Sequence, residues 1–202
     1  MKKRLSIILL LTFLVILSAC AQQKKDAPSA PQATKHNKPL IVEYGDYKCP
    51  YCKKVETQVM PTIKKKYIDT GKADYQFINM AFLGKDSIIG ARAGHAVNAI
   101  APQAYLDFQQ KIYAAQEKND DKEWITPKLI DKQIDQLNIS QQQKHKIKAD
   151  YKQENSQSWK AADKDKQLYK KHHISKAPTV FINGKKVKDP YDIKSWEQQL
   201  DK

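Results

Sequence analysis

The sequence predicts an α/β protein in which a small mixed β-sheet is interrupted by a long helical segment. Three observations predict this class. A strand–helix–strand pattern opens the folded part, helical signals fill residues 84–174, and a hairpin with a terminal helix closes the chain. Strands joined by a long crossover helix favour parallel pairing. The helical segment is therefore expected as an insertion into the sheet domain.

The folded part begins at Pro39 with a β-rich run over residues 40–45, which predicts a buried strand. Apolar side chains then recur at four-residue spacing and predict a helix over residues 53–70. Pro61 lies inside this helix and should kink it, because proline lacks the N–H group that a helix interior uses. A second strand is expected over residues 75–79.

The segment 84–174 carries helix signals and no convincing strand. Apolar spacing and charge predict helical stretches at residues 87–101, 104–115 and 144–171. Thr126 and Pro127 form a favourable N-cap and first-turn pair for another helix, and Ser140 is a further candidate cap. Residues 84–174 are thus expected to form an all-helical domain.

An Asn-Gly pair between two β-rich runs, residues 179–182 and 185–187, is the strongest two-residue hairpin signal. Asp192 is a candidate cap for a terminal helix. With the helical segment set aside, the order of elements is that of a thioredoxin-type sheet. We therefore expect a thioredoxin-like domain made of residues 39–83 and 175–202.

The first nineteen residues have the pattern of a bacterial signal peptide. Three basic residues precede an apolar run over residues 5–17, which is shorter than the roughly 20 residues that a spanning helix needs. The run ends in Leu-Ser-Ala-Cys, and small residues before a cysteine are typical of a lipobox. Residues 1–19 would then be removed and Cys20 would carry the lipid. A plain signal peptide that happens to end in cysteine is the alternative.

A lipid on Cys20 would hold the protein on the extracytoplasmic face of the cell membrane, because two or more acyl chains anchor a protein durably. Residues 20–38 form the expected tether, since the stretch after Cys20 has no aromatic residue and no Val, Ile or Leu. Thiols outside the cytoplasm are not kept reduced by glutathione and thioredoxin, so disulfide chemistry is permitted there.

The charge balance raises the question of a nucleic-acid or anionic partner. The 202 residues carry a formal charge of +14, and loss of residues 1–19 would leave +11. The lysines are, however, spread along every expected helix, with no basic tract interleaved with aromatic residues. A solvated basic surface is therefore favoured over nucleic-acid binding, and it also suits a protein held near anionic lipid.

The chemistry is expected at Cys49 and Cys52, which flank Pro50 and Tyr51 where strand becomes helix. This spacing brings both sulfurs onto the first helical turn. Cys49 comes first, where unpaired N–H groups and the helix dipole stabilise an anion. Its thiol pKa should fall, which makes Cys49 the attacking thiolate and Cys52 the resolving thiol.

Two other uses of the cysteine pair are disfavoured. A zinc site needs four ligands, but the chain has no second cysteine pair and no histidines at chelating spacing. His172 and His173 are adjacent, and we expect them to be solvated. A structural disulfide would close so short a loop that it would add little stability. We therefore expect redox chemistry, with neither a metal nor a cofactor beyond the Cys49–Cys52 disulfide.

With these motifs, the sequence resembles the DsbA-type thiol–disulfide oxidoreductases, specifically their lipid-anchored branch in Gram-positive bacteria. The resemblance covers residues 38–202 and rests on the lipobox, the Cys-Pro-Tyr-Cys motif, Glu43 six residues before the nucleophile, the helical insertion, and residues 177–184. The tetrapeptide by itself is also similar to glutaredoxins, which are shorter and have no signal or insertion. Two positions depart from the family: many members have histidine at Tyr51, and Val or Thr at Ala177.

The resemblance implies roles for further residues. Pro178 should be cis and lie against the cysteine pair, so that the backbone at Ala177 can pair with a substrate strand near Pro50 and Tyr51. Glu43 should lie beneath Cys52 and relay its proton. From the residues themselves, a carboxyl group within an apolar strand should have a raised pKa, unless it points to an exposed sheet edge. His95, on an apolar helix stripe, is expected to be a packing residue.

The resemblance implies a monomeric oxidase that transfers the Cys49–Cys52 disulfide to reduced secreted proteins. The alternative is a membrane-anchored reductase of the same fold. Reduction potentials of about −120 mV and about −270 mV, respectively, separate the two. The sequence does not identify the electron acceptor that reoxidises the enzyme.

Overall fold

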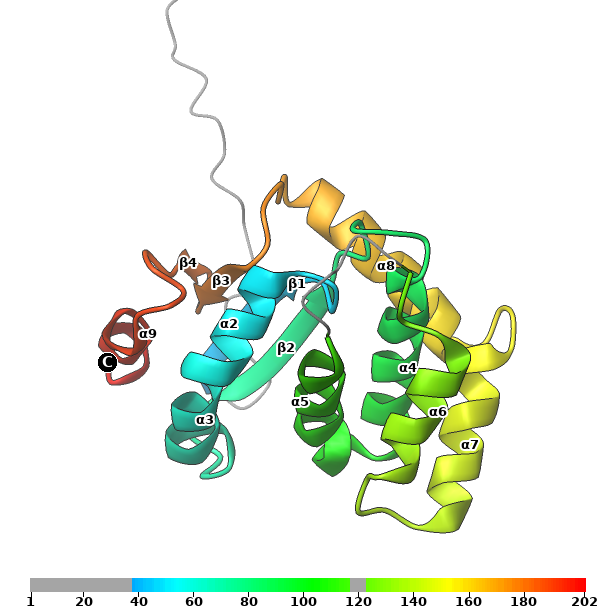
Figure 1. Ribbon diagram of the computed structural model, residues 1–202. Helices are drawn as coiled ribbons and strands as arrows, with labels where there is room; N and C mark the ends of the chain where they lie inside the picture. Colours follow the sequence, from blue (N-terminus) through cyan, green and yellow to red (C-terminus); the bar gives the residue numbers. More distant parts are fainter. Residues whose placement is uncertain (1–37, 117–122) are drawn as a thin grey trace, which may run out of the picture.

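The computed structural model describes residues 38–116 and 123–202 (Figure 1). The expected signal peptide, Cys20, and all of the expected tether except Lys38 lie outside these residues. Within the described residues, no helix has both the length and the apolar character needed to cross a membrane.

The described strands form one mixed sheet in the order β2-β1-β3-β4. The strands are β1 (Leu40–Gly45), β2 (Asp74–Asn79), β3 (Thr179–Ile182) and β4 (Lys185–Lys186). β1 pairs with β2 in parallel and with β3 in antiparallel fashion. Because β1 lies inside the sheet, all six of its residues are buried, and Glu43 is opposite Phe77 on one side and Val180 on the other.

The first helix begins three residues earlier than expected, at Pro50. It forms α2 (Pro50–Gln58), α3 (Met60–Ile63) and a π-helical turn (Lys64–Ile68). Proline is well tolerated at the first helical position, where its missing N–H would have no partner and its φ suits the helix. The break lies at Val59, two residues before Pro61, so the predicted kink is confirmed.

Between β2 and β3, the secondary structure of the described residues consists of helices joined by loops. It contains α4 (Ser87–Ile100), α5 (Tyr105–Ala115), α6 (Pro127–Asp135), α7 (Gln141–Lys152) and α8 (Gln157–Lys171). The charged stretch 144–171 belongs to two helices, because the chain turns at Asn155 (φ 62°) and restarts with Ser156 as N-cap. Thr126 and Ser140 are caps, as predicted.

The hairpin and the terminal helix also match the prediction. Asn183 and Gly184 both have positive φ, at 49° and 74°, as the two-residue turn between β3 and β4 requires. Helix α9 (Ile193–Leu200) has Asp192 as its N-cap, and the Asp192 carboxylate accepts the N–H groups of Lys194 and Ser195. The α/β class predicted from the sequence is thereby confirmed.

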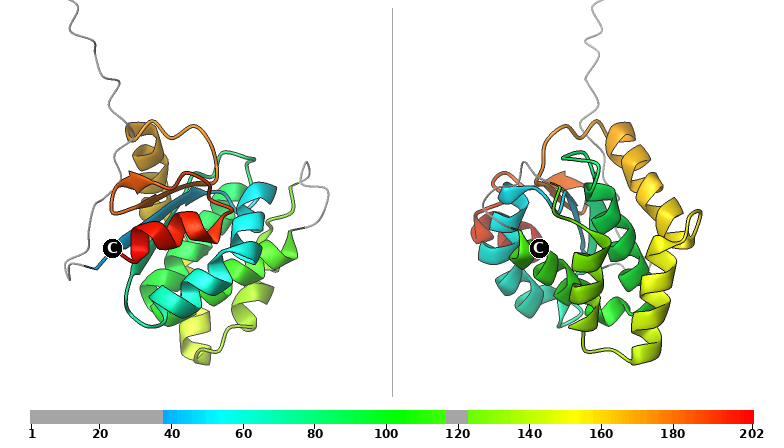
Figure 2. Two further views of the ribbon diagram at one scale, coloured as in Figure 1. Left: turned by 90° about the vertical axis from the view of Figure 1, so that its left-hand side faces the viewer. Right: turned by 45° about the vertical axis from the view of Figure 1, so that its right-hand side comes forward.

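The sheet separates two sets of helices (Figures 1 and 2). The face of β1 that carries Ile41 packs with Val55 of α2 and Trp196 of α9. The opposite face carries Val42 and Tyr44 and is covered from the α8 side. Of the remaining inserted helices, α5 lies between α2 and α6, and α6 and α7 pack on α4 beyond it (Figure 1). Glu43 lies two residues from both Ile41 and Gly45, so its side chain points to the same face of the sheet, toward α2.

Candidate active site

The two cysteines lie where β1 gives way to α2. Cys49 is the N-cap residue of α2, with extended backbone angles (φ −76°, ψ 117°), and Cys52 lies in the first turn. Both are free thiols, and both are buried. The sulfur of Cys49 therefore belongs to the helix end where backbone N–H groups lack helical partners and favour an anion.

The surroundings give the two thiols opposite acidities. A hydrogen bond from the Cys52 thiol, aided by the N–H groups of Cys52 and Tyr51, lowers the pKa of Cys49 to about 7. Burial and the charge of Asp46 oppose this shift without cancelling it. Burial raises the pKa of Cys52 well above its usual value, and the contact with Cys49 adds to this shift. This difference favours the predicted roles of Cys49 as attacking thiolate and Cys52 as resolving thiol.

Glu43 is buried on the face of β1 that looks toward Cys52. Its exposed fraction is 1%, which excludes the alternative of an exposed sheet edge. Gly45 marks the same face, because a Cβ atom added there would lie 3.3 Å from the sulfur of Cys52. Burial raises the pKa of Glu43 to about 8, as the sequence predicts in direction, and a hydrogen bond from Tyr75 partly opposes the rise.

A buried hydrogen-bond network continues from Glu43, and sequence reasoning did not find it. The Tyr75 hydroxyl donates to Glu43 Oε2 at 2.8 Å. The side-chain amide of Gln109 donates both to the Tyr75 hydroxyl at 3.0 Å and to Glu56 Oε2 at 2.9 Å. Burial raises the pKa of Glu56 as well. One signal was available: Glu56 follows Cys52 by four residues and so lies on the same helix face.

The loop before β3 approaches Cys49 from the other side. The peptide bond between Ala177 and Pro178 is cis, as predicted. The Cys49 thiol donates a long hydrogen bond of 3.7 Å to the carbonyl oxygen of Ala177. The structure thus brings together Cys49, Cys52 and Ala177. Contact between Ala177 and substrate stays a prediction.

An open groove of about 560 Å³ begins at Cys49. It is lined by Lys48, Cys49, Pro50, Tyr51, Phe82, Leu83, Ser175, Lys176 and Ala177. Tyr51 (63% exposed), Phe82 (44%) and Leu83 (39%) are the exposed large hydrophobic side chains of the described residues. All three line this groove, so the apolar surface of the described part gathers beside the nucleophile.

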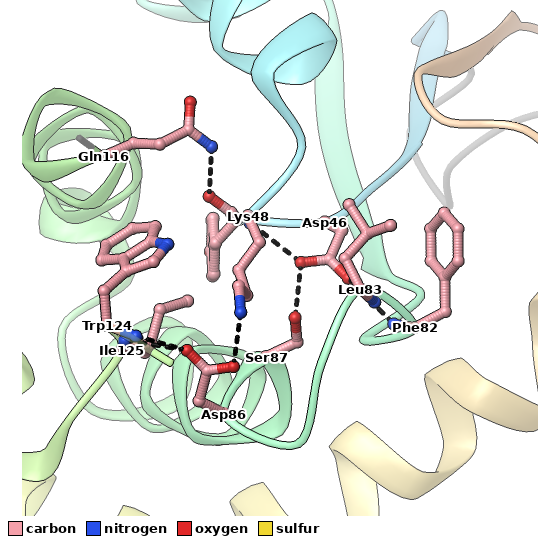
Figure 3. Close-up of polar contacts among 10 residues, drawn as sticks. Asp46, Lys48, Phe82, Leu83, Asp86, Ser87, Gln116, Trp124 and Ile125 are labelled. Carbon is pink, nitrogen blue, oxygen red and sulfur yellow. Dashed lines mark hydrogen bonds and ion pairs between the residues drawn. The ribbon is translucent and has the colours of Figure 1, made fainter. Parts of the chain in front are cut away.

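A second buried network fastens the active-site loop to the helical domain (Figure 3). The ammonium group of Lys48 lies 2.7 Å from Asp86 Oδ1, and both side chains are almost fully buried. The other oxygen of Asp86 accepts the N–H groups of Trp124 and Ile125, at 2.9 and 3.0 Å. The residue before Cys49 is therefore held against the start of α4 and the segment before α6.

Two expectations about histidines need correction. His95 is more than a packing residue, because its Nε2 lies 2.8 Å from Asp165 Oδ2. His172 is not simply solvated, because its Nδ1 lies 2.7 Å from the Tyr44 hydroxyl. In the described part of the chain, no three His, Cys, Asp or Glu side chains gather as a metal site would require.

Comparison with known proteins places this geometry in a family. The sequence model of the thioredoxin family matches residues 33–202. The chain is 35% identical to the probable disulfide bond formation protein D of Bacillus anthracis, over 80% of this chain and 72% of the relative. It is 33% identical to disulfide bond formation protein D of Bacillus subtilis, over 80% and 71%.

The fold comparison agrees with the sequence comparison. The crystal structure of oxidised BdbD from Bacillus subtilis aligns with a TM-score of 0.71 and 30% identity, and the alignment covers 88% of each chain. That structure supports a thioredoxin-like fold with an inserted helical domain. The chain therefore belongs to the DsbA-type thiol–disulfide oxidoreductases of the thioredoxin family, in the group found in Gram-positive bacteria.

Proposed function

We propose that this enzyme is an extracytoplasmic thiol–disulfide oxidase that transfers the disulfide of Cys49 and Cys52 to reduced secreted proteins. The observation that carries the proposal is the unequal pair of thiols at the end of an open, apolar groove. Cys49 has a pKa of about 7, whereas the pKa of Cys52 is raised well above its usual value. The names of the Bacillus relatives, which are disulfide bond formation proteins, support the same direction.

The first step breaks the enzyme disulfide. A substrate thiolate in the groove attacks the sulfur of Cys49, a mixed disulfide forms, and Cys52 leaves with the electron pair. Because the pKa of Glu43 is about 8, its carboxyl group is mostly protonated at neutral pH and can give a proton to the departing Cys52 sulfur.

The second step releases the product. A second substrate thiolate attacks the substrate sulfur of the mixed disulfide, and Cys49 leaves as a thiolate. The substrate loses two electrons and gains a disulfide, and the enzyme becomes a dithiol. A lower pKa makes Cys49 a better leaving group and stabilises the reduced enzyme, which favours oxidation of the substrate.

A second candidate is a reductase that uses the same pair in the opposite direction. It is favoured by the value of the Cys49 pKa, about 7. Thioredoxin, a reductant, has a nucleophile of pKa about 7, whereas the strong oxidant DsbA has one of about 3.5. Tyr51 explains the difference in part, because a neutral phenol cannot stabilise the thiolate as a charged histidine does.

Titration of the purified domain against glutathione redox buffers separates the two candidates. We expect a potential closer to the roughly −120 mV of an oxidant than to the roughly −270 mV of thioredoxin. A potential at or below the thioredoxin value would reject the oxidase and leave the reductase. Oxidation of a reduced dithiol peptide, followed by mass spectrometry, should occur with the same protein.

We also propose that the enzyme acts as a monomer on the outer face of the membrane, held by a lipid on Cys20. The basic start, apolar run and lipobox support this location. Cys20→Ala should release the protein into the medium or soluble fraction without changing the redox activity of the domain. Fractionation that leaves this variant on the membrane would contradict the lipid anchor.

A further inference from the structure

One edge of the groove beside Cys49 is held through its backbone N–H groups rather than by burial of its side chains. Phe82 and Leu83 form this edge, here called the apolar rim. Both side chains are exposed, so burial of the side chains does little to hold the backbone that carries them. The rim is flanked by Ala81 and Gly84, which both have positive φ, at 44° and 150°. A loop of this shape needs an external support to keep one conformation.

Asp46 supplies that support (Figure 3). Its side chain is fully buried just after β1, three residues before Cys49. One carboxylate oxygen accepts the N–H groups of Phe82 and Leu83, at 2.8 and 3.0 Å. The Asp46 carboxylate is thus bonded directly to both residues of the rim.

The other oxygen of Asp46 ties the rim to the nucleophile. It accepts the N–H group of Lys48 and the hydroxyl group of Ser87, both at 2.9 Å. The Cys49 N–H group donates to the backbone carbonyl of Asp46 at 2.9 Å. One residue therefore joins the rim, the cysteine loop and the first turn of α4.

We propose that Asp46 is a positioning residue: its carboxylate holds Phe82 and Leu83 of the apolar rim in place beside Cys49, where they can contact a substrate chain. The inference rests on the proposed use of the groove by protein substrates and names the residue that keeps the edge of the groove in place. Reduced, incompletely folded proteins expose apolar residues that their folded forms bury, and such residues match Phe82 and Leu83 in chemistry.

The chemistry of the carboxylate explains why aspartate is needed at this position. Four donors point at two oxygen atoms, and an ionised carboxylate accepts all four bonds. Asparagine has the same shape but only one accepting oxygen. In Asp46→Asn, one pair of donors would therefore face an NH₂ group, and either the rim or the Lys48–Ser87 side would lose its support.

The test compares three thiol substrates with the wild-type protein and its variants. Two are dithiol peptides of equal length, one with Leu and the other with Ser beside the attacking cysteine, and the third is dithiothreitol. The wild-type enzyme should prefer the Leu peptide by about tenfold in kcat/KM, which is the effect expected for burial of one large apolar side chain. Asp46→Asn should lose most of this preference, which is a ratio of two rates, while the rate toward dithiothreitol reports the shared effect of the altered Cys49 pKa.

Substitution of the rim itself gives a direct comparison. Phe82→Ser combined with Leu83→Ser changes exposed side chains, so the protein should fold, and it should lose the same preference. Adding Asp46→Asn to this double variant should have no further effect on the preference, because the two changes act through one contact. Asp131→Asn is the matched control: it removes a carboxylate that accepts the Tyr151 hydroxyl between α6 and α7, away from the rim, and it should retain the preference.

The charge of Asp46 provides a second readout. The charge raises the pKa of Cys49, so Asp46→Asn should lower this pKa in a thiolate absorbance titration, whereas the rim variant should leave it unchanged. Equal loss of rate with all three substrates in Asp46→Asn, or an intact preference in the rim variant, would overturn the proposal. The same peptides in disulfide form measure the preference in the reductive direction, so the outcome does not depend on the oxidase being correct.

Discussion

At the scale of single residues, the site works through groups whose surroundings push their proton affinities apart. Cys49 and Cys52 are alike in chemistry, but one accepts hydrogen bonds at a helix end while the other is buried and donates one. Burial raises the pKa of Glu43 to about 8, and a carboxyl group with this pKa can both give and take a proton near neutral pH. In the proposed reaction, each of these three residues acts in a distinct step.

The cysteine roles give the first prediction. Cys49→Ser should abolish both thiol oxidation and insulin reduction, because no thiol of comparable acidity remains. Cys52→Ser should instead accumulate mixed disulfides at Cys49, because the resolving thiol is missing. Non-reducing electrophoresis with a substrate in its disulfide form measures the trapping, because the Cys49 thiolate attacks that disulfide and the other substrate sulfur leaves as a thiol. Trapping by Cys49→Ser and no trapping by Cys52→Ser would reverse the assignment.

The Tyr75 hydroxyl gives the second prediction. Its hydrogen bond stabilises the ionised form of Glu43, so Tyr75→Phe should raise the pKa of Glu43 further above about 8. Less Glu43 is then ionised at neutral pH to accept the Cys52 proton. The rate at which Cys52 resolves a mixed disulfide should rise with pH only at higher values than in the wild type.

A pH–rate profile of mixed-disulfide resolution checks the Tyr75 prediction. Tyr67→Phe is the control, because it removes a similar bond from a tyrosine hydroxyl to a carboxylate, that of Asp201, away from the cysteines. An unchanged profile in Tyr75→Phe would show that Glu43 does not handle the proton of Cys52.

At the scale of elements, local signals in the sequence suffice wherever one short motif decides the structure. Thr126, Ser140 and Asp192 cap their helices because their side-chain oxygens reach N–H groups only two or three residues away. The Asn183-Gly184 turn is equally local. Such elements could be predicted with nearly correct bounds.

Contacts between distant elements could not be predicted in this way. Tyr75 lies 32 residues from Glu43, and Gln109 lies 53 residues from Glu56. Their hydrogen bonds depend on how α5 packs on the sheet, which no local pattern encodes. For the same reason, the motif at Cys49 and Cys52 was found from sequence, whereas the support of Asp46 for the groove was not.

The close packing of β1 against its neighbours gives the third prediction. A Cβ atom at Gly45 would lie 2.6 Å from the ring of Phe77, so Gly45→Ala forces the sheet or the ring to move. Overpacking of this kind costs about 1–3 kcal/mol in the free energy of unfolding. Urea unfolding measures it, and Gln58→Ala on the exposed side of α2 should change stability by less than about 0.5 kcal/mol.

At the scale of the whole molecule, the acidity of Cys49 links redox state to stability, which gives the fourth prediction. The folded pKa of about 7 lies below the unfolded value of about 8.5. The thiolate therefore stabilises the reduced fold above the unfolded value, and this contribution is lost as pH falls through 7. The reduced form should gain stability relative to the oxidised form as pH rises from about 7 to about 8.5.

Paired denaturant melts of the oxidised and reduced protein across this range measure the difference. The Glu43 carboxyl group titrates in both forms, so the comparison removes most of its contribution. A stability difference that is flat with pH would contradict an acidic Cys49. Cys49→Ser forms no disulfide, so its stability across the same pH range is the control for the reduced form without a thiolate at this position.

The edge strand β4 has a consequence for how this protein would interact with its substrates. β4 is only two residues long, and both are exposed lysines. An unpaired strand edge invites other chains to extend the sheet, and short, charged edges discourage this. An enzyme with the proposed function would meet exposed β-prone segments of its substrates at every turnover. Lys185 and Lys186 should therefore disfavour pairing of a substrate strand with β4, which leaves the sulfur atom of Cys49 as the place of contact.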